Sequence, residues 1–390
     1  MSGNWWRQDL TTPTPTGGRA ELVAGMLGTR LDSASLTTLG CEKGWEEKWD
    51  IPWTVGLVTG ESGTGKTSLI RDAWPGAITP AHLEWPADMA VVDLFPPSLP
   101  VGMVTRLLAG AGLSTVPAWL RPARALSTGQ RFRVTLARLL ALAVAEPGRP
   151  VVVDEFATGV DLATARAASV GAARLARELA VQLVAVTARE ELEEWLNPDW
   201  VARPRVLAGP DDRPATFQRR CLRRRPAISL QLGRCHRTSW DLFRSHHYLT
   251  GSLAPAAICL GAWVTGQPTI QVGFSAWVKA LGKPGFREHR TVVSPPWQGL
   301  GVGTALSDWC ASLLAGLGQA VWSTTGHPAL LASRTRSANW SMTRPPGLVN
   351  PERGRHHATC RMTAGFRYTG PVLDAARARA VLGRWGKSPG

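Results

Sequence analysis

The chain has 390 residues, of which 44% are apolar, and it carries a formal net charge of +15. This length is too great for one ordinary domain and suits two or three, each able to bury its own core. No apolar run approaches the roughly 18 residues that cross a bilayer, and the first residues lack the pattern of a secretory signal. The composition therefore predicts a soluble protein of the cytoplasm without membrane contact.

The positive charge is confined to the second half of the chain. Residues 1–200 hold 18 Lys and Arg against 22 Asp and Glu, whereas residues 201–390 hold 26 against 7. The first half is thus −4 and the second +19. Because neutralised phosphates release counterions, such a surface favours polyanions, and nucleic acid is the expected partner. The alternative is an arginine-rich composition that only aids solubility.

Six cysteines are scattered along the chain without a CxxC pair. We interpret them as reduced thiols. Cys235 stands beside His236, but no second pair lies at zinc-like spacing, so packing is the favoured role of both residues.

The first predicted domain covers residues 50–205, after a lead segment at residues 1–49. The lead contains a Pro/Thr/Gly stretch, and a short helix is expected at residues 21–27. We expect the whole to be a flexible lead and an edge segment. Apolar strands then alternate with helical patterns, which predicts a parallel sheet with crossover helices. The clearest strands are at residues 53–59, 151–153 and 181–187. A basic linker follows at residues 206–227, with Arg219, Arg220, Arg223, Arg224 and Arg225.

The second predicted domain covers residues 228–375 and precedes a tail at residues 376–390. Its pattern is mixed, with strands expected at residues 256–264, 270–278 and 290–294. A helix is expected at residues 304–315, directly after a glycine cluster.

A phosphate-binding loop is predicted at residues 60–67, where GESGTGKT fits GxxxxGK[ST] between an apolar strand and a helical segment. Glycines let the loop turn its amides toward phosphate oxygens, and the helix start adds positive potential. Lys66 would reach the β and γ phosphates, and Thr67 would ligate Mg²⁺. The residues expected to bind ATP here are Gly60, Ser62, Gly63, Gly65, Lys66, Thr67 and Ser68.

An acidic pair follows about ninety residues later, in VVVDE. Asp154 and Glu155 end a buried strand, where two carboxylates need a metal ion or water to justify them. We expect Asp154 to hold the Mg²⁺ shell and Glu155 to polarise the attacking water as the catalytic residue.

The segment LSTGQRFRVTLARLL, residues 126–140, stands between these motifs and resembles the LSGGQ signature of ABC-type ATPases. Ser127, Gly129 and Gln130 match, and Thr128 replaces a glycine. The segment FATGVD after the acidic pair resembles the D-loop of the same family and ends at Asp161. The resemblance implies an ABC-type nucleotide-binding domain that binds ATP and Mg²⁺.

In this family two ATPase domains pair head to tail, so the resemblance implies a homodimer in which Ser127 and Gly129 act on the partner's ATP. Two positions depart from the family. No glutamine lies between Lys66 and Gln130, and Ala188 and Arg189 stand where a switch histidine is expected. We therefore predict slow, dimer-dependent hydrolysis or an ATP-driven clamp.

A second glycine motif, QGLGVG, follows the apolar strand RTVV and precedes a helix. It fits the Q/R-x-x-G-x-G/A motif of GNAT acyltransferases, and the resemblance implies an α+β acyltransferase domain that takes acetyl-CoA or another acyl-CoA. Strand residues Val292 and Val293 would pair with the pantetheine arm, and loop amides would cradle the pyrophosphate. The loop residues expected to bind are Gln298, Gly299, Leu300, Gly301, Val302, Gly303 and Thr304. A tight turn without ligand is the alternative.

Acyl transfer to an amine needs a base for the nucleophile and an acid for the departing thiolate. His247 and Tyr248, in HHYLTGSL, and His327, in TTGHPALL, are the expected catalytic residues, with His289 a weaker candidate. The family's usual tyrosine acid, on the helix after the fifth strand, has no equivalent here. Tyr248 and Tyr368 are the chain's two tyrosines.

Together the motifs resemble predicted fusions of an ABC-type ATPase with a GNAT acetyltransferase domain in bacteria, archaea and phages. The leading hypothesis is an ATP-dependent or ATP-gated N-acetyltransferase acting on a base in DNA or RNA, in the host cytoplasm if a phage encodes it. One alternative is a DNA-bound ABC clamp in repair or packaging with a degenerate transferase domain. The other is an ATP-regulated acetyltransferase of proteins or small amines.

Overall fold

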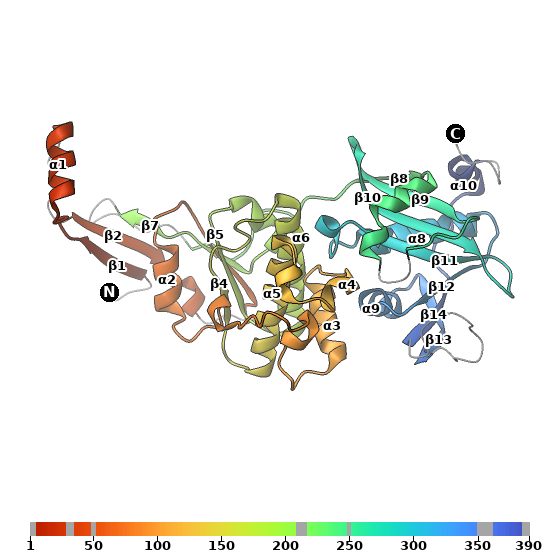
Figure 1. Ribbon diagram of the computed structural model, residues 1–390, viewed down its shortest axis with the longest axis horizontal. Helices are drawn as coiled ribbons and strands as arrows, with labels where there is room; N and C mark the ends of the chain where they lie inside the picture. The colour runs from red at the N-terminus through yellow and green to blue at the C-terminus, as the bar shows by residue number, and fades with distance from the viewer. Residues whose placement is uncertain are drawn as a thin grey trace. The chain divides into compact units, whose positions relative to one another are not determined.

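The computed structural model describes residues 5–28, 35–47, 52–207, 217–247, 251–348 and 362–383, which form two compact units (Figure 1). Unit 1 comprises Met1–Leu83, Glu146–Gly159 and Ala176–Arg225. Unit 2 comprises Glu84–Ala145, Val160–Leu175 and Pro226–Gly390. The predicted domains were continuous in sequence, whereas these units are not. The middle of the predicted ATPase domain belongs to unit 2.

Unit 1 contains a parallel sheet with the strand order β4-β5-β3-β6 among the described residues. The side chains of its first three strands are all buried, as expected for parallel strands covered on both faces. Each of these three observed strands lies within one of the predicted strands, at residues 53–59, 151–153 and 181–187. The strands are β3 (Val55–Thr59), β4 (Val151–Val153), β5 (Leu183–Thr187) and β6 (Trp200–Ala202), and the helices of this part are α2 (Lys66–Ala73) and α7 (Glu193–Leu196).

The N-terminal segment, which we expected to be a flexible lead and an edge segment, contributes two strands of a sheet and is not a flexible lead. β1 (Trp5–Thr12) pairs antiparallel with β2 (Ser35–Glu42), and β7 (Arg205–Leu207), from the predicted linker, pairs with β2. Helix α1 (Gly18–Leu27) lies between the first two strands in sequence. Three buried side chains anchor this sheet, because Leu39 and Cys41 point into the core and Trp6 donates to Asp72 at 3.1 Å.

A cluster of tryptophans fills the core of unit 1. The rings of Trp74 and Trp200 stack with centroids 5.9 Å apart, and Trp45 and Trp53 pack around them. Aromatic rings bury large apolar areas, so these contacts dominate the packing of this unit. These four tryptophans are therefore core residues.

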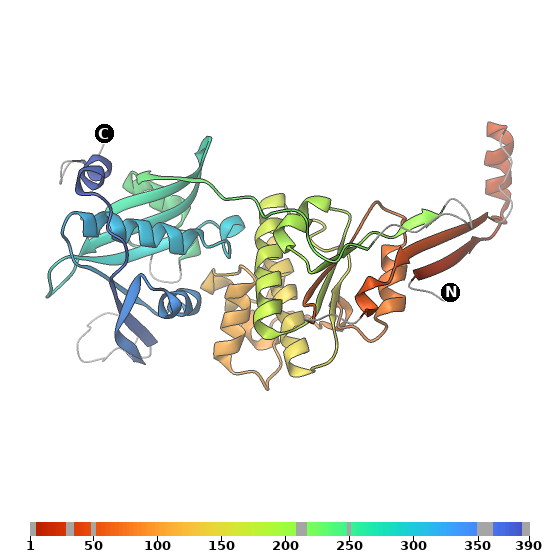
Figure 2. The same cartoon turned by 180° about the vertical axis from the view of Figure 1, so that it is seen from behind.

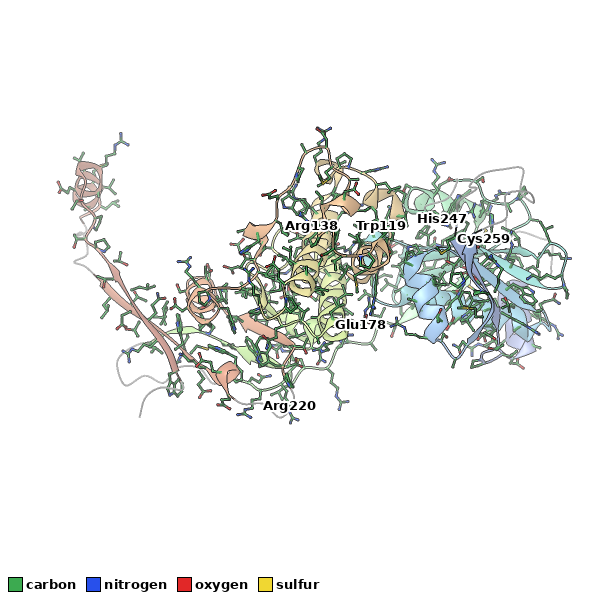
Figure 3. All side chains as sticks on the ribbon, turned by 90° about the horizontal axis from the view of Figure 1, so that it is seen from below. Trp119, Arg138, Glu178, Arg220, His247 and Cys259 are labelled. Atoms are coloured by element: carbon green, nitrogen blue, oxygen red, sulfur yellow. The ribbon has the colours of Figure 1, made fainter. Side chains whose placement is uncertain are left out.

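Unit 2 begins with helices. They are α3 (Val101–Gly110), α4 (Val116–Trp119), α5 (Thr128–Ala145) and most of α6 (Leu162–Leu179). Arg138 anchors α5, because its guanidinium donates to the carbonyls of Leu94 and Glu84 at 2.8 Å each (Figure 3). Gly110 on α3 and Gly171 on α6 permit close packing, since a Cβ at either would meet the neighbouring helix at about 2.5 Å.

The rest of unit 2 is a mixed sheet with the order β13-β14-β12-β11-β10-β9-β8 among the described residues. Helix α8 (Val302–Gly316) packs on this sheet (Figure 2). Together with the parallel sheet of unit 1, it confirms the predicted α/β fold class. The strands are β8 (Leu230–Arg234), β9 (Ile258–Val264), β10 (Gln267–Lys279), β11 (Phe286–Val293), β12 (Val321–Thr325), β13 (Trp340–Leu348) and β14 (Met362–Tyr368).

The parallel strands β11 and β12 pair only at their beginnings. Phe286 lies opposite Val321 and Arg287 opposite Trp322, after which no further pairs form. Both strands continue beyond this point, β11 by six residues and β12 by three. The carboxyl ends of the two strands therefore diverge and leave a wedge in the sheet.

The end of the described chain is helical where a tail was expected. Asp374 accepts hydrogen bonds from the amides of Ala376 and Arg377 at 3.0 Å and so caps α10 (Ala375–Leu382). Ala378 and Leu382 are buried and join the core beneath α8. Helix α9 (Pro328–Arg336) completes this unit.

Candidate functional site

The predicted phosphate loop joins β3 to α2 as expected. Gly60, Gly63 and Gly65 have φ values of 145°, 83° and 89°, which side chains would strain. No acceptor among the described residues receives the amides of residues 61–67. A loop of free amides ahead of a helix start is a fitting cradle for phosphate oxygens.

Leu39 of β2 supports this loop and was missed by the sequence analysis. A Cβ on Gly65 would meet the Leu39 side chain at 2.5 Å, so loop and strand are in close contact. The apolar residues Leu39 and Cys41, two positions apart in SLTTLGCE, were the available signal. The N-terminal sheet thus packs against the predicted phosphate loop.

Thr67, Asp154 and Lys66 lie together at the start of α2. The Thr67 hydroxyl donates to Oδ2 of Asp154 at 2.7 Å, and Lys66 Nζ donates to the carbonyl of Gly60 at 2.8 Å. Burial lowers the pKa of Lys66, and the charge of Asp154 partly opposes this. A hydroxyl and a carboxylate oxygen are ligands that Mg²⁺ prefers, so the donor set fits the predicted ion. Ser62 and Ser68 lie in the same loop and first helical turn.

Glu155 follows Asp154 with a left-handed backbone. Its φ is 52°, and its amide donates to Oδ1 of Asp154 at 2.9 Å. A positive φ is unusual for a residue other than glycine and costs on the order of 1 kcal/mol or more. The conformation leaves the Glu155 side chain exposed beside the proposed magnesium ligand.

Arg189 lies at the position where the ABC-type motif has a switch histidine. Its Nη1 donates to the carbonyl of Ala157 at 3.1 Å, and its Nε donates to Glu191 at 3.1 Å. The guanidinium therefore holds the segment just after Glu155.

The predicted signature lies at the start of α5 in unit 2. The Ser127 hydroxyl accepts from the amide of Gln130, and the Gln130 side chain accepts from the amide of Ser127, at 3.3 and 3.1 Å. This reciprocal cap fixes the helix start. Ser127 is exposed and Gly129 is half-buried, where a Cβ would press on Thr164. The arrangement presents an 18-residue helix's N-terminus to solvent.

The second glycine loop lies at the mouth of the wedge between β11 and β12. Gly299 and Gly301 have φ values of 86° and 84°, and Gly301 is the N-cap of α8. The amides of residues 299–304 have no acceptor among the described residues. Of the strand residues expected to pair with pantetheine, Val292 is buried and Val293 is half-buried. The six amides and the edge of β11 that β12 leaves without a strand partner together fit a pyrophosphate and an extended amide chain.

Gln298 has a different role from the other loop residues. Its side chain accepts from the amide of Ser114 at 2.9 Å and donates to Thr115 Oγ1 at 3.2 Å and to the Val293 carbonyl at 2.9 Å. The residue is only 6% exposed. Its amide group is therefore engaged by the protein, and the sequence motif alone gave no sign of this.

His327 is the N-cap residue of α9 and lies half-buried after β12. Its Nε2 lies 3.0 Å from the Ser114 carbonyl, and the ring of Trp119 lies 6.0 Å away. Burial lowers the pKa of His327, although the hydrogen bond to Ser114 opposes this. A carbonyl only accepts, so Nε2 carries the hydrogen in this contact.

His247 and His289 lie elsewhere in the same unit. His247 packs edge-on against Trp240, with ring centroids 5.7 Å apart (Figure 3). Nε2 of His289 accepts the amide of Ala254 at 3.2 Å. Burial, with help from Arg290 and Arg287, lowers the pKa of His289 to about 4. His289 is therefore neutral at pH 7, and Tyr248 lies outside the described residues.

A buried ion pair lies beneath the wedge and was not predicted. Oε2 of Glu288 accepts from Arg334 at 2.6 Å and from Ser323 at 2.7 Å, and its Oε1 accepts from Ser307 at 2.9 Å. Burial raises the pKa of Glu288, but Arg334 and the hydroxyl donors outweigh burial and bring it below its ordinary value. With its oxygens filled, Glu288 binds β11 to α8, α9 and β12. The signal was a glutamate at a buried position of a strand.

The sequence matches no protein-family model and no curated protein. Similar solved structures include ABC ATPase cassettes and GNAT acetyltransferases. The cbiO1 protein of Clostridium perfringens, part of an ABC transporter complex, is 16% identical over 43% of this chain and 77% of its own, with a TM-score of 0.32. A dimeric bacterial ABC transporter cassette is 14% identical over 40% and 86%, with a TM-score of 0.31. The ribosomal-protein-S18-alanine N-acetyltransferase of Escherichia coli is 13% identical over 37% and 96%, with a TM-score of 0.28.

The described residues contain neither a membrane-spanning helix nor a metal-binding cluster. None of their helices combines the length and apolarity that a bilayer crossing requires. Nor do they contain a group of three or more His, Cys, Asp or Glu side chains placed to share a metal ion.

Proposed function

We propose that this chain is an ATP-dependent N-acyltransferase that takes its acyl group from an acyl-CoA. The observation that carries the proposal is the loop at residues 299–304, whose free amides follow a strand that parts from its parallel neighbour. Such amides bind the pyrophosphate of CoA, and the unpaired strand end takes the amides of the pantetheine arm. Acetyl-CoA is the donor to test first.

In the transfer step the acceptor nitrogen attacks the thioester carbon. A C–N bond forms and the C–S bond breaks. The amine proton goes to a base, and the CoA sulfur leaves as a thiolate that takes up this proton to become the thiol. His327 and His247 are the bases we propose to test, since a neutral imidazole accepts a proton near pH 7.

The nucleotide half is proposed to bind ATP with Mg²⁺ held by Thr67 and Asp154, and Glu155 is proposed to polarise water. The exposed start of α5, with Ser127 and Gly129, supports contact with the ATP of a second copy of the chain, and hence a homodimer. Arg189 supports slow hydrolysis, because it brings a fixed guanidinium where the ATPase motif has a histidine. ATP then acts as a gate for the transferase.

Nucleic acid is the acceptor we propose. Residues 220–225 line an open cavity of about 610 Å³ with four arginines and Asn197. Arg223 pairs with Glu193, and Arg220 (Figure 3), Arg223 and Arg224 are all exposed. Side chains of this kind contact phosphates without reading sequence, which suits an enzyme that must hold a polymer while it modifies one base.

One observation favours the second candidate function, a nucleic-acid clamp with a degenerate transferase domain. The Tyr368 hydroxyl donates to the carbonyl of Pro371 at 2.8 Å and its ring packs on Trp340. Within the described residues the Tyr368 hydroxyl is therefore already hydrogen-bonded, and it is not free to protonate the departing CoA thiolate.

Two matched glycines test the acyl-CoA site. Gly301 and Gly318 flank α8, have φ values of 84° and 73°, and each leaves open space for a Cβ. Alanine at either position costs similar backbone strain, but only Gly301 belongs to the loop of free amides. By calorimetry with acetyl-CoA, Gly301→Ala is expected to weaken binding about tenfold and Gly318→Ala less than about twofold. A wild-type chain that binds no acetyl-CoA would leave the clamp as the function.

A further inference from the structure

The loop between α3 and α4, residues 111–115, contacts both ends of the wedge that the proposed acyl-CoA site occupies. At the end of β11, the amide of Ser114 donates to Gln298 at 2.9 Å. At the end of β12, the carbonyl of Ser114 lies 3.0 Å from His327 Nε2. One residue of unit 2 is thus hydrogen-bonded to the two sides of the opening.

The loop is itself firmly held by its own helices. The amide of Leu113 donates to Leu108 at 3.0 Å, and Trp119 Nε1 donates to the Leu113 carbonyl at 2.7 Å. Thr115 is 4% exposed. The loop is rigid and is bonded to both sides of the wedge, so its position sets the distance between them. A displacement of the loop therefore changes the width of the wedge.

Backbone packing strengthens the contact with the glycine loop. A Cβ on Gly112 would lie 3.2 Å from the Gln298 carbonyl, and a Cβ on Gly299 would lie 3.3 Å from the Gly112 Cα. Both glycines have φ near 90°. Two backbones meet here without side chains between them, so a shift of one is passed directly to the other.

Arg133 connects this contact to the signature helix. It lies on α5, one turn after Gln130, and is 1% exposed. Its Nε and Nη2 have no hydrogen-bond partner among the described residues, and Nε lies 3.4 Å from the position of a Cβ on Gly112. Burial lowers the pKa of Arg133 to about 10 against the opposing charge of Asp161, so the group is charged at pH 7. A buried cation with unused donors is costly, and a nearby carbonyl would relieve that cost.

We propose that residues 112–115 are a coupling element that sets the width of the acyl-CoA wedge according to the nucleotide state of the signature helix. Arg133 and Gln298 are positioning residues in this coupling: nucleotide at Ser127 and Gly129 displaces α5, Arg133 moves toward the Gln298 carbonyl, and the glycine loop follows. The inference rests on the proposed function, because it needs a nucleotide and an acyl-CoA that bind the same chain.

The test measures the dissociation constant of acetyl-CoA for the full chain by calorimetry, with and without Mg²⁺ and a non-hydrolysable ATP analogue. Wild type is expected to show at least about a fivefold change. Thr115→Val, which removes one of the two acceptors of the Gln298 side-chain amide, and Arg133→Met are expected to reduce the change to less than about twofold. Matched controls are Thr105→Val on α3, whose hydroxyl bonds only Gly102, and Arg131→Met on α5, which lies over Trp85.

The outcomes separate the coupling from the function. If wild type binds both ligands with no change in the acetyl-CoA constant, the coupling is wrong and the proposed function survives. If Thr115→Val and Arg133→Met keep the wild-type change, coupling takes another route and the inference is overturned. If wild type binds no acetyl-CoA, the proposed function itself fails and the coupling fails with it.

Discussion

The hydroxyl of Thr67 donates a hydrogen bond to Oδ2 of Asp154 at 2.7 Å, although 87 positions separate the two residues in the sequence. Thr67 lies in the first turn of α2, and Asp154 directly follows β4. The parallel sheet of unit 1 brings the start of α2 and the end of β4 together. The contact places two oxygen ligands of the kind that Mg²⁺ takes beside Lys66. The phosphate loop and the acidic pair, which were recognised separately, therefore form one site.

This relationship predicts that Thr67→Val weakens binding of Mg²⁺-ATP by about tenfold to a hundredfold, because a ligand is lost while the side-chain shape is kept. The matched control is Thr64→Val in the same loop, whose exposed hydroxyl donates only to the Glu61 carbonyl. Calorimetric titration with ATP in the presence of Mg²⁺ measures both. Equal losses in the two variants would show that Thr67 has no special role.

The buried pair of Glu288 and Arg334 makes a stability prediction. Removing one partner leaves a charge without compensation, so Arg334→Met is expected to lower the free energy of unfolding by about 3–5 kcal/mol. Denaturant unfolding measures the change. For comparison, Arg124→Met breaks an exposed pair with Asp88 and is expected to cost less than about 1 kcal/mol. Similar losses from the two variants would contradict the structural role of the buried pair.

The pKa of His289 predicts a dependence of stability on pH. Its pKa is about 4 in the folded chain and near 6.5 in an ordinary setting. The unfolded chain therefore binds more protons between these values, so the contribution of His289 is complete above about pH 6.5 and is lost as the pH falls toward 4. The difference in unfolding free energy between wild type and His289→Gln should therefore shrink as the pH falls from about 6.5 to about 4. A difference that is constant from pH 7 to pH 4 would contradict a buried neutral imidazole.

The arginine cavity of unit 1 predicts a salt-dependent contact with nucleic acid. Replacing Arg220 and Arg224 together by Gln is expected to lower the slope of log affinity against log salt concentration by about 1.5 to 2 for duplex DNA. Replacing Arg19 and Arg121 by Gln removes the same charge from other exposed positions and serves as the control. Fluorescence anisotropy with a labelled duplex at several salt concentrations measures the slopes. An unchanged slope in the Arg220 and Arg224 variant would remove these residues from the interface.

The local motifs were predictable from the sequence because each needs a short run of residues in a fixed order. Gly63 and Gly65 lie between a strand and a helix, as do Gly299 and Gly301. Both loops could therefore be recognised, the second through its resemblance to the GNAT motif. Strand bounds shifted by a few residues, since apolar runs fix a strand's middle better than its ends.

What the sequence could not supply depends on contacts between distant segments. Leu39 supports the phosphate loop from a segment expected to be a flexible lead, because a sheet with β7 orders it. Gln298 was expected to bind the cofactor, yet its side chain bonds Ser114, 184 positions away. His327 was expected to be a catalytic residue, and its Nε2 lies 3.0 Å from the carbonyl of the same Ser114. The residue pattern within one segment does not indicate which distant segment its side chains will contact.

The central claim is tested most directly by transfer of labelled acetyl from acetyl-CoA to DNA, RNA or protein, with and without ATP, followed by mass analysis of the digested polymers. The account predicts that a nucleoside gains the mass of an acetyl group and that ATP increases the yield. It also predicts that Glu155→Gln slows the ATP turnover by about a hundredfold, as expected when the group that activates water is lost. Acetyl label in none of the polymers, from a chain that binds acetyl-CoA, would contradict it.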